Sequence, residues 1–225
     1  MFYFDTKTKT FGLSLNDVRI LNPNISIADD CTSVKNYVGY TETDRPQYNE
    51  IYQTIEEDIP VNGKQVWKIV SLENTPSNLE KVTKIVKDKI TTYRVSIEEG
   101  GVTWEKGVTI KTAVEDQNRL TSMVTAASFA DLGEVDFNAG DQWLKVNIKQ
   151  IQQFSGLIAH HVMLCYAEER RLHEMVDSFA NDLVKIANFD YKKEWNINKE
   201  TAKESMTKIE DEKNSGASEE ESTTA

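Results

Sequence analysis

Four side chains that can bind metals or take part in catalysis recur at regular spacing near the C-terminal end of the chain. His161, Cys165, Glu169 and His173 are each four residues apart, so on a helix they would form one slowly drifting stripe. Imidazole, thiolate and carboxylate are all zinc ligands. At 1.5 Å per residue the stripe is about 18 Å long, so a closed site would need ligands from another helix or subunit. We favour the alternative that these polar groups interrupt a helical seam and set its register. We therefore predict neither a metal site nor a cofactor, while zinc binding by the stripe stays open at this point.

Nucleophilic catalysis has little support in the sequence. The three histidines, His160, His161 and His173, fall in the same stretch, and no serine or cysteine lies in a Gly-x-Ser-x-Gly elbow or a cysteine-protease context. Cys165 follows His161 by four residues, yet a thiol on an apolar helical face is more often a small core residue than a nucleophile. The Gly100-Gly101 pair follows a predicted helix and precedes a predicted strand, the reverse of the order in a phosphate-binding loop. We therefore expect no catalytic residues and a protein that is not an enzyme.

The element expected to carry these side chains is one long helix over residues 147–190. Asn147 is a good N-cap residue, no proline follows it, and Gly156 is the last glycine before the C-terminal tail. Apolar side chains repeat every seven residues, which predicts an unbroken helix of about 40 residues, against an average of about 11–12 in globular domains. The six members of this heptad seam are Ile151, Ile158, Cys165, Leu172, Phe179 and Ile186.

The small module that precedes this helix can cover only part of the seam, which leaves two possibilities. Either the N-terminal part folds back over the remainder, or the helix pairs with copies of itself or with another protein. His161, Glu168 and Asp182 occupy the second core position of their heptads, which favours a bundle or a partner-filled groove over an isolated two-stranded coiled coil. We expect the six seam positions to bind a partner and the chain to form a homo-oligomer.

Residues 1–74 are predicted to form a β-rich module. Apolar residues flank Asn62-Gly63, whose two members both tolerate positive φ, and this is the strongest short-range signal of a β-hairpin. The first 40 residues fit a strand, a turn at Gly12 and a short helix within Ala28–Tyr37.

Residues 75–146 are predicted to form a second module of helices, a hairpin and a strand. Thr75-Pro76-Ser77 is typical of a helix start, and this helix should end near Gly100-Gly101. The elements expected after it are a hairpin with its turn at Gly107, a helix over residues 113–128, a loop over 133–141 and a strand over 142–146. With the long helix after them, the two modules predict an α+β fold.

The four tryptophans divide into two groups. Trp67, Trp104 and Trp143 lie in predicted strands, so we expect them to be core anchors rather than a ligand-stacking platform. Trp195 lies beyond the heptads, where it could dock the end of the helix or a partner together with Phe189 and Tyr191.

Composition limits the classes of function. The 225 residues include 26 lysines and arginines and 37 acidic residues, and this net charge of −11 disfavours nucleic acid as a partner, because capture of a phosphate backbone relies on cationic side chains. No stretch approaches the about 18 consecutive apolar residues of a membrane span, and the N-terminus lacks a signal-peptide pattern, so we expect no membrane contact. Residues 191–225 are acidic and poor in apolar side chains, which predicts a largely disordered tail.

One part of the sequence resembles a known kind of domain. It contains a short predicted hairpin with a tryptophan after a Gly-Val start, a helix, a tryptophan-bearing strand and a closing helix with a histidine before a charged stretch. These features are carried by Trp104, by Gln117 and Arg119, by Trp143, and by His160 or His161. Upstream, RPQYN at residues 45–49 and the following PVNGKQVWKIVSL look like the strand pairs that often precede this domain. Over about residues 38–187 the chain resembles a small domain of unknown function that recurs in bacteriophage tail and tail-fibre-associated proteins.

The resemblance implies a non-enzymatic structural protein of the phage tail, which attaches or connects the fibre and the baseplate. It would be assembled in the host cytoplasm and reside in the virion tail, with other tail, fibre or baseplate proteins as partners. A tail-fibre assembly chaperone that leaves the particle is the alternative. An acidic decoy that mimics nucleic acid is a third possibility, which the net charge permits.

Overall fold

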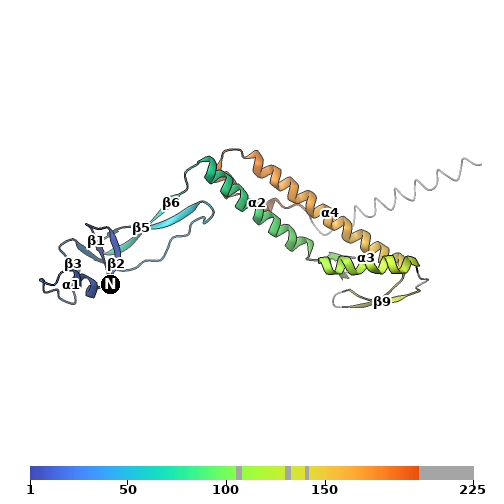
Figure 1. The fold of residues 1–225 in the computed structure, drawn as a ribbon, viewed down its shortest axis with the longest axis horizontal. Coiled ribbons are helices and arrows are strands. Elements are labelled where there is room, and N and C mark those ends of the chain that lie inside the picture. The colour runs from blue at the N-terminus through green and yellow to red at the C-terminus, as the bar shows by residue number, and fades with distance from the viewer. Residues whose placement is uncertain (105–107, 130–132, 140–141, 198–225) are drawn as a thin grey trace, which may run out of the picture. The chain divides into compact units, whose positions relative to one another are not determined.

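The computed structural model describes residues 1–104, 108–129, 133–139 and 142–197, and it contains both strands and helices, which confirms the α+β prediction (Figure 1). The chain divides into two compact units. The first consists of Met1–Val82 together with Asn181–Asn188, and the second of Thr83–Ala180 together with the described residues from Phe189 onward. None of the described helices is both long and apolar enough to cross a membrane.

The first unit begins with a four-stranded antiparallel sheet in the order β2-β1-β4-β3. Its elements are β1 (Phe2–Asp5), β2 (Thr10–Leu13), α1 (Leu15–Leu21), β3 (Ser33–Val34) and β4 (Tyr37–Tyr40). The helix predicted within residues 28–37 is wrong, because α1 starts earlier, at a capping box. There the Ser14 hydroxyl accepts a hydrogen bond from the backbone of Asp17, whose carboxylate accepts one from the backbone of Ser14.

A long two-stranded hairpin follows, formed by β5 (Gln53–Val61) and β6 (Lys64–Ser71). Asn62 and Gly63 have φ of 50° and 70°, so both turn residues are left-handed, as a two-residue type I′ turn requires. The hairpin predicted around this dipeptide is confirmed.

Helix α2 (Pro76–Glu98) starts at the predicted proline and ends near the glycine pair, as predicted. Gly101 has φ of 84°, and an added Cβ would lie 2.9 Å from Thr109 Cγ2, so both its backbone conformation and its surroundings require glycine. The chain then forms β7 (Val102–Thr103), β8 (Thr109–Ile110) and α3 (Val114–Phe129). The turn predicted at Gly107 lies outside the described residues.

A second small hairpin, β9 (Val135–Asn138) with β10 (Trp143–Val146), lies beside α3 (Figure 1). The strand at β10 was predicted, whereas the loop expected over residues 133–141 is wrong because it contains β9. Val135 and Phe137 alternate with Asp136 and Asn138, the period of a half-buried strand, and Phe137 is buried.

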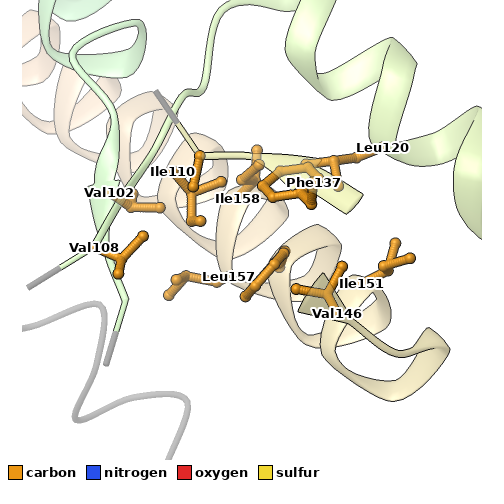
Figure 2. Packing of buried hydrophobic residues seen from close by; sticks show 11 residues of the cluster. Val102, Val108, Ile110, Leu120, Phe137, Val146, Ile151, Leu157 and Ile158 are labelled. Atoms are coloured by element: carbon orange, nitrogen blue, oxygen red, sulfur yellow. The ribbon is translucent and has the colours of Figure 1, made fainter. Parts of the chain in front are cut away.

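The main hydrophobic core of the second unit joins the two small hairpins, α3 and the start of α4 (Figure 2). Phe154 is fully buried, with Trp104 4.7 Å and Phe137 5.3 Å away between ring centroids. Trp104 is therefore a core anchor, as predicted. The buried members of this core are Val102, Val108, Ile110, Leu120, Phe137, Ala139, Val146, Ile151, Phe154, Leu157 and Ile158.

Helix α4 (Ile148–Ser178) starts at the predicted cap, where the Asn147 side chain accepts a hydrogen bond from the Gln150 backbone. It has 31 residues and not about 40, because the chain leaves the helix at Phe179. Ala180 takes a left-handed φ of 51°, and the Asp182 carboxylate then caps a separate helix, α5 (Leu183–Ala187). The heptad pattern continues through this break in the sequence, but the helix does not.

The prediction of a largely disordered tail over residues 191–225 is wrong for its first residues. Tyr191–Glu194 form the short helix α6, and Trp195 packs edge-on against Tyr93 of α2, with 5.3 Å between ring centroids. Tyr191 also contacts Tyr93, at 5.8 Å. The aromatic side chains beyond the heptads thus dock on the chain's own helix, while residues 198–225 lie outside the described part.

Candidate functional site

The side chains singled out for their chemistry lie along the surface where α2 and α4 face each other, here called the polar seam. The two helices run antiparallel (Figure 1), because contacts from successive α2 residues reach progressively earlier α4 residues. Lys87 pairs with Asp177 at 2.6 Å, Arg94 with Glu169 at 2.8 Å, and the carbonyl oxygen of Ile97 with His161 at 3.2 Å.

Arg94 is the central charge of the polar seam, and its side chain is 9% exposed. It forms ion pairs with Glu98 on its own helix and with Glu169 on α4, and its guanidinium lies 4.3 Å from the ring centroid of Tyr166. Thr91 donates a hydrogen bond to Glu169. Every charge in this cluster is therefore paired, as a buried charge must be.

Arg94 was not identified in the sequence, although its spacing from the buried residues of α2 indicates that it is buried. Val82, Val86 and Ile90 form the buried stripe of α2 at four-residue spacing, and Arg94 and Glu98 continue it at the same spacing. A paired cation and anion on an otherwise apolar stripe indicate a buried ion pair.

His161 and Cys165 lie together on α4, with 3.7 Å between Nε2 and Sγ, but they do not form a catalytic pair. His161 Nε2 also lies 3.2 Å from the carbonyl oxygen of Ile97, which can only accept, so this nitrogen carries a hydrogen and cannot take one from the thiol. Burial raises the pKa of Cys165 to about 11, although the nearby charge of Arg94 lowers it somewhat. Cys165 is fully buried, which confirms its interpretation as a core residue.

The two remaining members of the four-residue stripe are also engaged in other contacts. Glu169 pairs with Arg94, and His173 Nε2 donates to the backbone oxygen of Lys87 at 3.3 Å. Within the described residues, no group of three or more His, Cys, Asp or Glu side chains is placed to hold a metal ion. The four residues of the stripe therefore make separate contacts and do not converge on one point.

Glu168 holds the segment after α6 against α4. Its carboxylate accepts hydrogen bonds from Arg171 at 2.6 and 2.9 Å and from the backbone of Asn196 at 2.8 Å, and Arg171 also donates to the carbonyl oxygen of Glu194. Burial alone would raise the pKa of Glu168, but these hydrogen bonds and the charge of Arg171 hold it below its ordinary value. Glu168, which interrupts the heptads, thus has its hydrogen-bond partners within the chain.

The six predicted partner-binding positions are placed differently from the expectation. Ile151, Ile158, Cys165 and Leu172 are buried in the second unit, and Ile186 is buried in the first. Phe179 is half-buried and packs on Phe189 at 5.3 Å. Five of the six positions are therefore covered by the chain's own residues in this structure, and Phe179 is partly covered.

The second candidate site is a pocket between α3 and the β9–β10 hairpin, here called the α3 pocket, with a volume of about 220 Å³. Trp143 stands at this pocket with 73% of its surface exposed, so the prediction that it anchors the core is wrong. Lys145 and Asp136, also at the hairpin, form an exposed pair at 3.8 Å. The pocket is lined by Lys111, Asp116, Arg119, Leu120, Met123, Asp136, Phe137, Asn138 and Trp143.

Large apolar side chains are exposed elsewhere in both units. On α1 of the first unit, Ile20 and Leu21 are 67% and 57% exposed, and at the end of α3 Phe129 is 88% exposed. None of these belongs to the buried core of its unit. These side chains leave apolar surface open to solvent in both units.

A family model described as a domain of unknown function (DUF4376) matches residues 80–193, slightly more than half of the chain. The match covers the polar seam, the α3 pocket and the main core of the second unit. No curated protein and no solved structure matches the chain.

Proposed function

Because the chain belongs to the DUF4376 family, whose function is unknown, its role has to be inferred from its own residues, and we propose that it is a non-enzymatic structural protein of a bacteriophage tail. In this role it attaches or connects the fibre and the baseplate, resides in the virion tail, and binds other tail proteins and copies of itself. The resemblance of residues 38–187 to domains of phage tail proteins supports the phage setting.

The observation that carries the proposal is that each unit exposes large apolar side chains outside its own core. Ile20 and Leu21 do so in the first unit, and Phe129 and Trp143 in the second. A connector needs one docking surface for each of its two neighbours, and aromatic side chains are the usual anchors of such surfaces.

The contacts of the polar seam support a non-enzymatic role. Arg94, Glu169, His161 and Cys165 are the residues whose types suit catalysis, and each makes an intrachain contact. The Arg94–Glu169 ion pair and the contact of His161 with the Ile97 carbonyl oxygen join α4 to α2, and Cys165 lies beside His161 on α4 itself. The docking surfaces must therefore lie on other residues. For the same reason the homo-oligomer we propose does not use the buried heptad positions, and its contacts fall to exposed side chains such as Phe129.

The proposal is tested by quantitative mass spectrometry of particles purified from cells infected with a phage that encodes this chain. We expect the chain in a fixed whole-number ratio to a known tail protein. Its presence in the lysate together with its absence from the particles would identify the assembly chaperone instead, and its absence from both the particles and tail-assembly intermediates would refute a role in the tail.

A variant locates the docking surface in the same experiment. Replacement of Phe129 by serine should lower the amount of chain per particle at least several-fold, since the exposed ring is the anchor. The matched control is Asn118→Ser, which changes an exposed polar side chain of the same helix and should leave the ratio unchanged. Equal ratios for the two variants would remove Phe129 from the docking surface.

A further inference from the structure

The α3 pocket has an apolar floor and one exposed aromatic wall. Leu120 and Phe137 are buried and form part of the main core, and Met123 packs against them. Trp143 is different, because most of its indole surface is open to solvent beside a pocket of about 220 Å³. A pocket of this size holds one ring and is smaller than the about 300–1,000 Å³ of drug-sized ligand sites.

The polar lining of the pocket contains both signs of charge in equal number. Lys111 and Arg119 are cationic, Asp116 and Asp136 are anionic, and Asn138 adds an amide that can donate and accept. The carboxylates already have partners, since Asp116 lies 3.0 Å from Arg119 and Asp136 lies 3.8 Å from Lys145. The lining therefore offers donors and acceptors without a net charge.

This combination selects one ligand chemistry. An anion such as phosphate needs a surplus of cations, and a divalent cation needs a surplus of carboxylates, and the lining has neither. A purely apolar ring would contact the indole of Trp143 and the apolar floor but would use none of the charged and amide groups of the lining. A hydroxyl group both donates and accepts, so a ring that carries several hydroxyls can pair with Arg119, Asp116 and Asn138 at once, while its C–H face stacks on the indole of Trp143.

We propose that the α3 pocket binds one ring of a neutral saccharide, with Trp143 as the stacking wall. This function goes beyond structural attachment and does not depend on it, because the binding can be measured on the purified chain without any particle. A negative result in the saccharide test leaves the tail proposal intact, and absence of the chain from particles leaves the saccharide proposal intact.

The test uses the full chain labelled with 5-fluorotryptophan and observed by ¹⁹F NMR, which gives separate signals for Trp67, Trp104, Trp143 and Trp195. The Trp143→Phe variant assigns its signal. The probes are glucose, galactose, mannose, rhamnose, N-acetylglucosamine and N-acetylgalactosamine, with inorganic phosphate and the tripeptide Gly-Phe-Gly as chemically different competitors. We expect at least one sugar to shift the Trp143 signal saturably, while the signal of Trp104, which packs in the core, stays in place.

A second variant separates recognition from stacking. Arg119→Gln should weaken the binding of that sugar about tenfold, because it removes a charged donor from the pocket rim, whereas Lys149→Gln, at an exposed position outside the pocket, should not change it. No saturable shift of the Trp143 signal with any of the six sugars overturns the proposal. A shift caused by phosphate or by the tripeptide, and by none of the sugars, overturns it as well.

Discussion

The polar seam and the α3 pocket distribute polar and apolar side chains in opposite ways. At the polar seam Arg94, Glu98 and Glu169 are buried and paired between two helices. At the α3 pocket the charged side chains of Arg119 and Asp136 are mostly exposed, and so is the indole of Trp143. The charged residues of the polar seam, whose types suggest chemistry, are therefore buried, whereas tryptophan, which is typical of cores, is exposed at the α3 pocket.

This difference teaches which residues to assign to structure and which to function. Burial of an ion pair carries a free-energy cost of desolvation, which is offset only where the two groups satisfy each other. We therefore assign such a pair to the packing of the two helices. An exposed tryptophan leaves apolar surface in water without a gain to the free chain, so we assign Trp143 to the contact with a ligand that we propose for the α3 pocket. In this protein function is expected at the exposed aromatic side chains and not at the histidines and the cysteine.

Among the substitutions that distinguish the two regions, Arg94→Met should change the free energy of unfolding most. The substitution leaves the Glu98 and Glu169 carboxylates buried without their cation, and we expect the free energy of unfolding to fall by about 3–5 kcal/mol. Urea denaturation monitored by circular dichroism measures this loss of stability. The matched control is Lys84→Met on the same helix, whose pair with Asp88 is exposed and should be worth less than about 1 kcal/mol. Equal losses in the two variants would contradict the structural importance of the buried cluster.

A smaller effect is expected from acid at Glu168, which holds the segment after α6 against α4. The pKa of Glu168 is lower in the folded chain than its ordinary value of about 4.3, so its contribution is complete above that value and is lost as the pH falls through the folded pKa. The free energy of unfolding of the wild type should therefore decrease more steeply below about pH 4 than that of Glu168→Gln. Parallel pH profiles for the two proteins would show that Glu168 makes no such contribution.

The smallest effect on stability is expected at the α3 pocket. Trp143→Ser removes a large side chain, yet most of its surface is already exposed, so the free energy of unfolding should change by no more than about 0.5 kcal/mol. Trp104→Ser is the comparison, because Trp104 packs against Phe154 and its loss should cost about 3 kcal/mol or more. A large loss for Trp143→Ser would make this side chain part of the core and remove the contrast between the two regions.

Local rules predicted much of the fold. The Asn62-Gly63 dipeptide, the proline at the start of α2, the glycines after it and the Asn147 cap each act within a few residues, and each was identified in the sequence. The apolar period predicted α4 as far as Ser178. It failed at the end of the helix, because the break depends on a left-handed alanine and on the capping carboxylate of Asp182, neither of which interrupts a heptad pattern.

The candidate site could be predicted less well, because burial depends on tertiary contacts. Cys165 was correctly interpreted as a core residue, but the seam positions were expected to face a partner, whereas the chain's own elements cover them. Trp143 was expected in the core because tryptophan in a strand usually packs inward. Its strand alternation places Leu144 and Val146 on the side of the core and leaves Trp143 on the opposite face, and which face is buried depends on tertiary packing that the strand's own sequence does not show.

The most direct test of the division between a structural interior and a functional surface is the reaction of the native chain with iodoacetamide at pH 8, read by peptide mass spectrometry. Cys165 is fully buried, and its pKa of about 11 leaves about a thousandth of the thiol ionised at this pH, so we expect no label on it until urea unfolds the chain. Cys31 is partly exposed and should be labelled in the native state. Labelling of Cys165 in the native chain as fast as Cys31 would contradict the account, because it would place an accessible, reactive thiol beside His161.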